Sequence, residues 1–446
     1  MSTDPYLPAV GSDVLALDAA RLELDVRLAA NRIAGTAVLH GRLLAQTARV
    51  ELDLHRLSVT EVKAQAAGRP LPRVKASQPR RRPHRVVVEL GESLPAGTEL
   101  ELTLDYRGTP KPRRSPWGTV GWEELTDGVL VAGQPHGAST WMPCVDSPDN
   151  RMSADITVTC DAGYLPVSNG TGTPVKQSGS RTTWRWVLDE PVPPYLLTLQ
   201  IGRYRLIELP GRSDGPPITL AVTPQTQQRA LTALGAQHRM AEVFQAAYGP
   251  YPFDAYTAVV ADDDLEIPLE CAGLSLFGTN HLTSQWEDER LIAHELSHQW
   301  FGNAVTLGHW ADLWLHEGFA CYSEWLWSEA SGRESVQAHA RRAWQGLAEQ
   351  PQDVALTDPG PKDMFDDRVY KRGALTVLAL RRLLGDAVFG RMVRGWVAEH
   401  RFGTVDTAMF RAHVHSWAPA AGVTAAAVDA LFDAWTVEAA LPAFPS

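Results

Sequence analysis

The sequence predicts an α+β protein with two domains: an N-terminal all-β domain, antiparallel and sandwich-like, and a mainly helical second domain that opens with a few strands. Three observations carry this prediction. Apolar and polar residues alternate from about residue 14 to 205, proline and glycine are concentrated between 203 and 217, and long helical patterns follow. We therefore place the two domains at residues 1–205 and 206–446.

The first domain is predicted from alternation with a period of two, which gives a strand one buried face and one solvated face. Residues 22–28 read Leu-Glu-Leu-Asp-Val-Arg-Leu, and similar runs recur at 50–54, 86–90 and 100–104. Such short strands separated by turn residues are typical of an all-β domain.

The second domain is predicted to begin with strands at 218–222 and 256–260 and a helix over 225–248. Helices dominate after this mixed start. This order is typical of an α+β domain.

The most informative motif is His294-Glu295-Leu296-Ser297-His298. Two histidines at i and i+4 of a helix share one face, so both imidazoles can reach one cation. Glu295, between them, is placed to take a proton from a water that the metal activates. We expect Ser284 and Glu287 to form a capping box at the start of this helix.

A third ligand is predicted at Glu317, in the first turns of a second amphipathic helix that begins near 312 and stops at Gly332. Two histidines and one carboxylate leave a fourth zinc position open, as in catalytic sites. The alternative is a buried His/Glu cluster bonded within itself. Glu324, seven residues further on, is either a partner of a ligating histidine or an ordinary solvated glutamate.

At this point the chain resembles a known family. The runs HELSHQWFGNAVT and WADLWLHEGFACYSE are similar to the zinc-binding core of the gluzincin aminopeptidases, the family of aminopeptidase N and leukotriene hydrolase. The resemblance covers nearly the whole chain, in a short two-domain form that lacks the family's helical C-terminal domain. It implies a thermolysin-like catalytic domain and one zinc ion per chain.

The resemblance also assigns residues outside the metal motif. Glu270 stands where the family's Gly-x-Met-Glu-Asn motif binds the free α-amine of the substrate, and Gln134 stands where a family Gln or Glu also grips that amine. Tyr370, in a Tyr-x-x-Gly match, stands on the tyrosine whose hydroxyl stabilises the oxyanion. From the residues alone, Glu270 reads as a loop carboxylate, Gln134 as a turn residue and Tyr370 as a packing residue before the next helix.

The amine-binding motif departs from the family pattern at every position except Glu270. Ile267, Pro268, Leu269 and Cys271 replace its other residues. Pro268 has no N–H with which to hold a substrate backbone, so substrate positioning is expected to differ in detail.

Together these positions predict a zinc aminopeptidase that releases N-terminal residues from peptides with a free amine. His294, His298 and Glu317 would hold zinc, Glu295 would be the general base, and Tyr370 would stabilise the oxyanion. Two alternatives stay open. One is an endopeptidase or an enzyme with epoxide-hydrolase-like activity that uses the same site, and the other is a scaffold protein that has lost catalysis.

Composition sets the remaining bounds. A formal net charge of −11 argues against nucleic acid as a partner. Four cysteines without CxxC spacing are too few for a disulfide scaffold and indicate a reducing compartment. The start MSTDPYLPAVGSD does not resemble a signal peptide, and no apolar run approaches eighteen residues, so we expect a cytoplasmic protein without a membrane partner.

Five other histidines have no spacing that suggests metal ligands: His309, His316, His339, His413 and His415.

Overall fold

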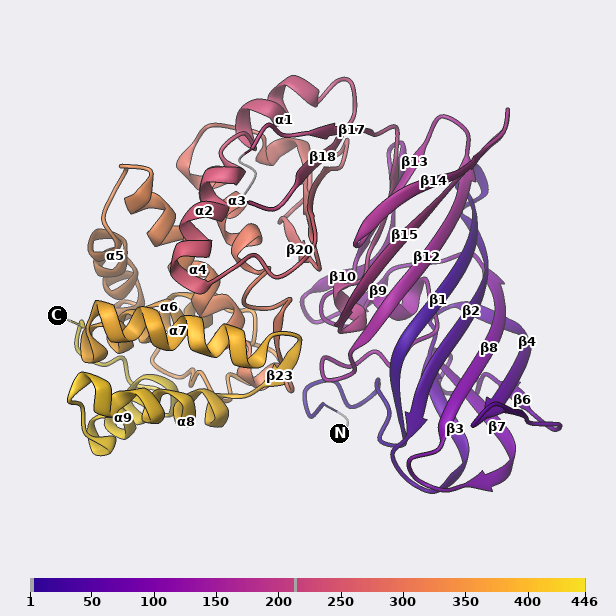
Figure 1. Cartoon of the computed structure of the whole chain (residues 1–446), viewed down its shortest axis with the longest axis horizontal. Helices are drawn as coiled ribbons and strands as arrows, with labels where there is room; N and C mark the ends of the chain where they lie inside the picture. The colour runs from indigo at the N-terminus through magenta and orange to yellow at the C-terminus, as the bar shows by residue number, and fades with distance from the viewer. Residues whose placement is uncertain (1–3, 212–214, 446) are drawn as a thin grey trace. The chain divides into compact units, whose positions relative to one another are not determined.

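The computed structural model describes residues 4–211 and 215–445, so the first three residues of the N-terminal segment lie outside it. The chain forms two compact units. The first comprises Met1–Leu209, Thr219–Ala230 and Asp254–His281, and the second comprises Pro210–Ile218, Leu231–Phe253 and Leu282–Ser446. In Figure 1 the indigo to magenta half of the chain is drawn almost entirely as strands, whereas the orange to yellow half is mainly helical.

The largest sheet of the first unit has eight strands within the described residues, in the order β14-β15-β12-β1-β2-β8-β4-β5. Its strands are β1 (Leu15–Arg27), β2 (Arg32–Leu43), β4 (Leu57–Ala66), β5 (Arg69–Pro70), β8 (Glu99–Gly108), β12 (Met152–Asp161), β14 (Thr171–Gln177) and β15 (Arg181–Val192). Residues of β12 alternate between buried and partly exposed along its whole length, as the period-two pattern predicts. One pairing was not predicted: β1 and β12 run parallel, because β12 enters the sheet after a long crossover rather than a hairpin.

Three smaller sheets complete the strands of this unit in the described ranges. One sheet contains β3 (Thr47–Asp53), β6 (Lys75–Ser77) and β7 (Arg85–Leu94). Another contains β9 (Arg113–Ser115), β10 (Gly118–Leu125), β11 (Gly128–Ala132), β13 (Leu165–Ser168) and β16 (Leu199–Gly202). The last contains β17 (Arg205–Glu208), β18 (Ile218–Val222), β19 (Tyr256–Val260), β20 (Leu269–Cys271) and β21 (Leu274–Phe277). A shared core joins Trp186 of β15, Leu130 of β11 and Leu276 of β21. The short β20 strand is therefore anchored to the β-rich unit.

The second unit is built from helices. They are α2 (Gln237–Tyr248), α3 (Trp286–Ser297), α4 (Trp314–Ala330), α5 (Val336–Ala348), α6 (Asp367–Leu384), α7 (Asp386–His400), α8 (Thr407–Trp417) and α9 (Ala425–Phe432), with a parallel strand pair formed by β22 (Val305–Leu307) and β23 (Gly403–Val405). The β-rich start and helical remainder confirm the predicted α+β class.

Two local predictions were wrong, and so was the position of Tyr370 in the alternative that made it a packing residue. The helix predicted over 225–248 is two helices, α1 (Gln227–Ala233) and α2, separated at Gly235. The predicted capping box of Ser284 and Glu287 is not formed. Gln285 is the N-cap residue of α3, and the hydroxyl of Thr283 donates a hydrogen bond to Asp288. Tyr370 lies in the first turn of α6 rather than before it, because Asp366 caps that helix by accepting a hydrogen bond from the backbone N–H of Arg368.

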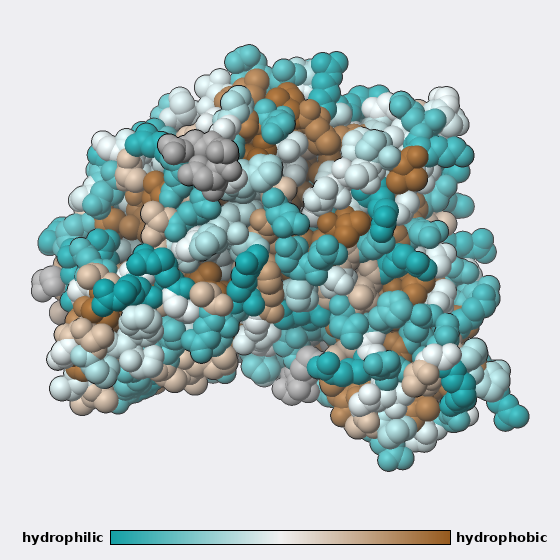
Figure 2. All heavy atoms as spheres, in the orientation of Figure 1, coloured by the Kyte–Doolittle hydropathy of each residue, from teal (hydrophilic) through white to brown (hydrophobic). Residues whose placement is uncertain are grey.

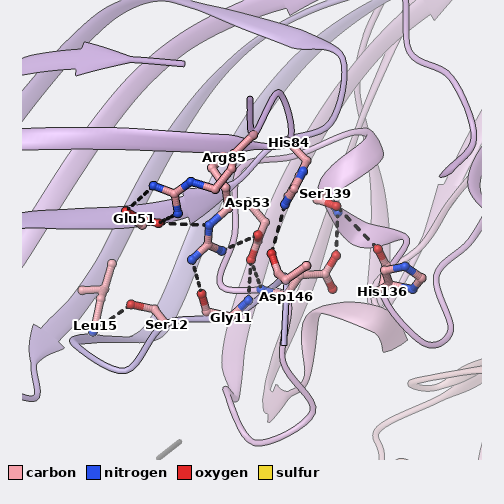
Figure 3. A network of polar contacts seen from close by, with 12 residues as sticks. Gly11, Ser12, Leu15, Glu51, Asp53, His84, Arg85, His136, Ser139 and Asp146 are labelled. Atoms are coloured by element: carbon pink, nitrogen blue, oxygen red, sulfur yellow. Dashed lines mark hydrogen bonds and ion pairs between the residues drawn. The ribbon is translucent and has the colours of Figure 1, made fainter. Parts of the chain in front are cut away.

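A buried ion network fixes the run Trp141–Pro148 that follows Gln134 (Figure 3). Arg85 donates to Asp53 (2.5 Å) and to the carbonyl of Gly11 (2.7 Å). Asp53 also accepts hydrogen bonds from the backbone N–H of Gly11 (2.8 Å) and of Asp146 (3.1 Å), and Asp146 accepts from the backbone N–H of Ser139 (3.2 Å). Burial, with the charge of Asp53 nearby, raises the pKa of Asp146 to about 7.

The surface is largely hydrophilic on the face drawn in Figure 2, with hydrophobic residues interspersed. Across the described residues, the exposed large hydrophobic side chains are Val175, Leu206, Ile267, Met409 and Val437. Within the same residues, none of the helices is both long enough and apolar enough to cross a membrane.

Candidate active site

Helix α3 places His294, Glu295 and His298 on consecutive turns of one buried segment. Their exposed fractions are 7%, 5% and 1%, and the two imidazole centroids lie 4.7 Å apart. The helix ends at Ser297 with His298 as its C-cap residue. The carbonyl of His298 accepts a hydrogen bond from the N–H of Asn303, and Gly302 between them has a φ of +123°. The helical spacing therefore brings both imidazoles to one point, as expected from i and i+4.

Glu317 comes to the same point from α4. Its Oε2 lies 3.2 Å from His294 Nε2 and 3.5 Å from His298 Nε2. Bonds of about 2.0–2.1 Å to a tetrahedral zinc ion place two ligand atoms about 3.4 Å apart. Both distances from Glu317 Oε2 match this spacing, and all three donor atoms lie within 4.8 Å of one another, so their arrangement and chemistry suit a zinc ion.

The outer nitrogen of each imidazole is held by an acceptor, which fixes the form of the ring. His298 Nδ1 lies 2.9 Å from the carbonyl of Phe301, and a carbonyl only accepts, so Nδ1 carries the proton. His294 Nδ1 lies 2.8 Å from Glu324 Oε1. Both arrangements leave Nε2 as the nitrogen that faces Glu317, and such partners orient metal-binding histidines.

Two cations that the sequence reasoning did not single out surround Glu324. Arg290 Nη1 contacts both of its carboxylate oxygens, at 3.3 and 3.2 Å. Lys371 donates to Cys321 Sγ at 3.4 Å, and its charge also acts on Glu324. Burial alone would raise the pKa of Glu324, but Lys371, His294 and Arg290 lower it to about 2. Arg290 stands four residues before His294 on α3, and this spacing is the signal that could have revealed it.

The carboxylates make this point favourable for positive charge. Burial lowers the pKa of an imidazole, yet Glu317 and Glu324 outweigh burial and raise the pKa of His294 to about 9. Burial would raise the pKa of Glu317, but His298 and His294 hold it well below its usual range. A buried environment that stabilises a proton between these groups also stabilises a divalent cation there.

Tyr370 lies beside the histidines because α6 packs closely on α4. Its ring is nearly parallel to that of His294, at 17° with centroids 6.2 Å apart. One turn further along, Gly373 meets Gly318 of α4, and a Cβ built on Gly373 would lie 2.7 Å from Gly318 Cα. The glycine of the Tyr-x-x-Gly match is thus the residue that lets the helix carrying Tyr370 approach the helix carrying Glu317.

Gln134 and Glu270 belong to the first unit and contact each other directly. Gln134 Nε2 donates to Glu270 Oε1 at 2.5 Å, and Glu270 is 4% exposed. Glu270 lies on β20, which pairs with β21, and the next residue, Cys271, is fully buried. The Asn169 side chain contributes to this support by donating to the carbonyls of Leu196 and Ala272, both at 2.8 Å.

Comparison with known proteins identifies the family of this arrangement. The peptidase family M1 domain matches residues 232–435, and the peptidase M1 N-terminal domain matches residues 17–196. The two matches cover most of the chain. The protein therefore belongs to peptidase family M1, and its β-rich domain and helical domain are those of that family.

Solved structures and curated relatives agree with this assignment. An M1 zinc metallopeptidase from Deinococcus radiodurans is 28% identical with a TM-score of 0.87, and a mutant bound to a Tyr-Ser-Ala substrate gives 0.86; both alignments cover 100% of each chain. The probable aminopeptidase 1 of Sulfurisphaera tokodaii is 26% identical over 61% of this chain, and leucine aminopeptidase 2 of Emericella nidulans is 24% identical over 90%. The chain spans 37% of the first of these relatives and 67% of the second.

Proposed function

We propose that this protein is a zinc metalloaminopeptidase that releases N-terminal residues from peptides. The observation that carries the proposal is the buried donor set of His294, His298 and Glu317, whose ligand atoms lie within 4.8 Å of one another, with Glu295 on the same helix as His294. Membership of peptidase family M1 and the aminopeptidase names of its relatives support it.

In this proposal His294 Nε2, His298 Nε2 and Glu317 Oε2 hold one zinc ion. When bound, zinc supplies a Lewis acid that polarises the scissile carbonyl and acidifies a water. Glu295 takes a proton from the attacking water and delivers it to the leaving amine. The Tyr370 hydroxyl donates a hydrogen bond to the carbonyl oxygen as that oxygen gains negative charge, which stabilises the transition state more than the ground state.

Glu324 is proposed as the residue that orients His294. Arg290 and Lys371 keep its carboxylate ionised, so it accepts the proton on Nδ1 and leaves Nε2 for the metal.

Selection of the chain end is assigned to Glu270 and Gln134. A buried carboxylate pairs strongly with an ammonium group, and the free N-terminus of a peptide supplies one. The Gln134 amide donates to Oε1 of Glu270, so the two side chains lie together at the point where the amine would bind. The net negative charge argues against nucleic acid as a partner, and the four buried cysteines, none of which forms a disulfide within the described residues, support a cytoplasmic setting.

The test is hydrolysis of matched free and N-acetylated aminoacyl anilides and short peptides by wild type, Glu295→Gln and Glu270→Gln, with zinc measured on each sample. We expect wild type to cleave only free amines. Glu295→Gln should keep its zinc and lose turnover, and Glu270→Gln should keep its zinc and lose kcat/KM for free amines. The control is Glu266→Gln, an exposed glutamate four residues away that should behave as wild type.

Two results would contradict the proposal. Cleavage of acetylated peptides as fast as free ones would indicate an endopeptidase. A zinc-loaded wild type without hydrolytic activity on any of these substrates would indicate a scaffold protein.

A further inference from the structure

A second set of metal-ligand side chains lies where α7 ends and α8 packs beside it. Glu399 and His400 are the last two residues of α7, and His413 is in the middle of α8. One ligand atom from each residue lies within 4.8 Å of the others. None of the three is a residue of the proposed catalytic centre.

The geometry of His413 is the strongest evidence. Its Nε2 lies 3.0 Å from the carbonyl of Met392, and because a carbonyl can only accept, Nε2 carries the proton. The other ring nitrogen, Nδ1, lies 3.4 Å from Glu399 Oε2. An imidazole nitrogen and a carboxylate oxygen at this separation can both bind one metal ion. The same pattern, an imidazole N–H held by a backbone carbonyl, orients His298 in the catalytic motif.

Packing holds both imidazoles in place. The Trp396 ring has its centroid 4.1 Å from that of His400 and 5.2 Å from that of His413. Trp396 is 1% exposed, so this contact is a fixed part of the core. The nearby cations are directed elsewhere: Arg401 donates to the carbonyl of Pro252, and Arg394 donates to the carbonyl of Ala246 at 3.1 Å.

Access is provided by Glu399, whose side chain is 64% exposed, whereas the His413 side chain is only 8% exposed. Of the divalent ions, zinc and copper are well suited to a site of two imidazoles and one carboxylate. Water would complete the coordination on the open side.

We propose that Glu399, His400 and His413 form a second binding site for a divalent transition-metal ion, zinc or copper, that fastens the end of α7 to α8. The site is separate from peptide hydrolysis, and its occupancy raises the thermal stability of the second unit, because an ion that binds only the folded state stabilises that state.

The experiment starts from enzyme that holds one zinc per chain and titrates further zinc at pH 8, by calorimetry and by metal analysis after gel filtration. Wild type should take up a second equivalent, and its Tm should rise as zinc is added. Glu399→Gln and His400→Gln should both lose that second equivalent and the rise in Tm, while their peptidase activity stays unchanged. Copper added in place of the second zinc should give an electron paramagnetic resonance spectrum with nitrogen couplings.

The matched control is His415→Gln, which removes a partly exposed histidine of the same helix that contacts Asp429 instead. It should keep the second equivalent. Glu399 is exposed, so its variant folds even if a change at His413 does not. A wild type that binds no second equivalent at pH 8, or a second equivalent that survives in both Glu399→Gln and His400→Gln, would overturn the proposal.

Discussion

Replacing Gly373 by alanine tests whether the close approach of α4 and α6 sets the position of Tyr370. The new Cβ would lie 2.7 Å from Gly318 Cα and 3.3 Å from both Gly318 N and the Trp314 carbonyl oxygen. Carbon atoms in contact normally lie about 3.5–4.0 Å apart, so the helices must separate locally by about 0.8 Å. The obstacle is backbone of α4 rather than a flexible side chain, and it cannot rotate away.

The expected cost has two parts. Overpacking of this kind costs about 1–3 kcal/mol of unfolding free energy, partly offset by the higher helix propensity of alanine, which is worth about 0.5–1 kcal/mol. Tyr370, the proposed oxyanion-stabilising residue, lies one turn before Gly373, and a displacement near 1 Å at a catalytic group costs up to about 100-fold in rate. We therefore expect kcat to fall roughly 10- to 100-fold and Tm to fall by about 2–8 °C.

The assay is hydrolysis of a free aminoacyl anilide, with Tm and zinc content measured on the same preparation. Gly346→Ala provides the control, since Gly346 is an exposed residue of α5 with no atom within 4 Å of its added Cβ. That variant should keep wild-type kcat and gain about 0.5–1 kcal/mol of stability. If Gly373→Ala kept wild-type kcat and Tm, the argument from close approach would be refuted.

Three further predictions follow from the contacts described above. Glu324→Gln should weaken zinc binding about 10- to 100-fold, because the residue that orients His294 loses its charge; competition with a zinc chelator measures this, and unchanged affinity would exclude the orienting role. Asp146 has a folded pKa of about 7 against an ordinary value of 3.8, so between pH 5 and 7 the folded state binds the extra proton and stability falls as pH rises. Asp146→Asn should remove this dependence on pH. The free energy of unfolding of the variant minus that of wild type, measured with denaturant, should therefore be about 2–3 kcal/mol larger at pH 8 than at pH 5. A difference between variant and wild type that is the same at both pH values would contradict this prediction. Removing zinc with a chelator should abolish hydrolysis and lower Tm, both reversed by one equivalent of zinc, and a chelator-treated enzyme that stays active would rule out the proposed chemistry.

Much of the architecture was readable from local patterns. Period-two alternation marked β1, β3, β7 and β8, because each strand buries one face, and helical periodicity marked α3 and α4. The spacing of His294, His298 and Glu317 predicted the candidate metal site equally well, because its three donor atoms come from two segments that are close in the sequence.

The rest depends on contacts between residues distant in the chain. The parallel pairing of β1 with β12 has no local signature, and neither has the approach of Lys371 to Glu324. His413 was judged to have no useful spacing because its partners precede it by thirteen residues or more, across the end of α7 and the start of α8. Ser284 failed as a cap because capping depends on where the backbone turns, which the residue types alone do not fix.

The contact between Gln134 and Glu270 has a consequence for how such enzymes can change. Both residues belong to the unit that holds the β-sheets, whereas His294, Glu295, His298 and Glu317 belong to the helical unit. If Glu270 and Gln134 select the chain end as proposed, substitutions in the β-rich unit would alter which end of a peptide is recognised while the proposed catalytic groups keep their places. The proposed groups for recognition and for hydrolysis would then belong to different structural units, so protein engineering could modify one set without replacing residues of the other.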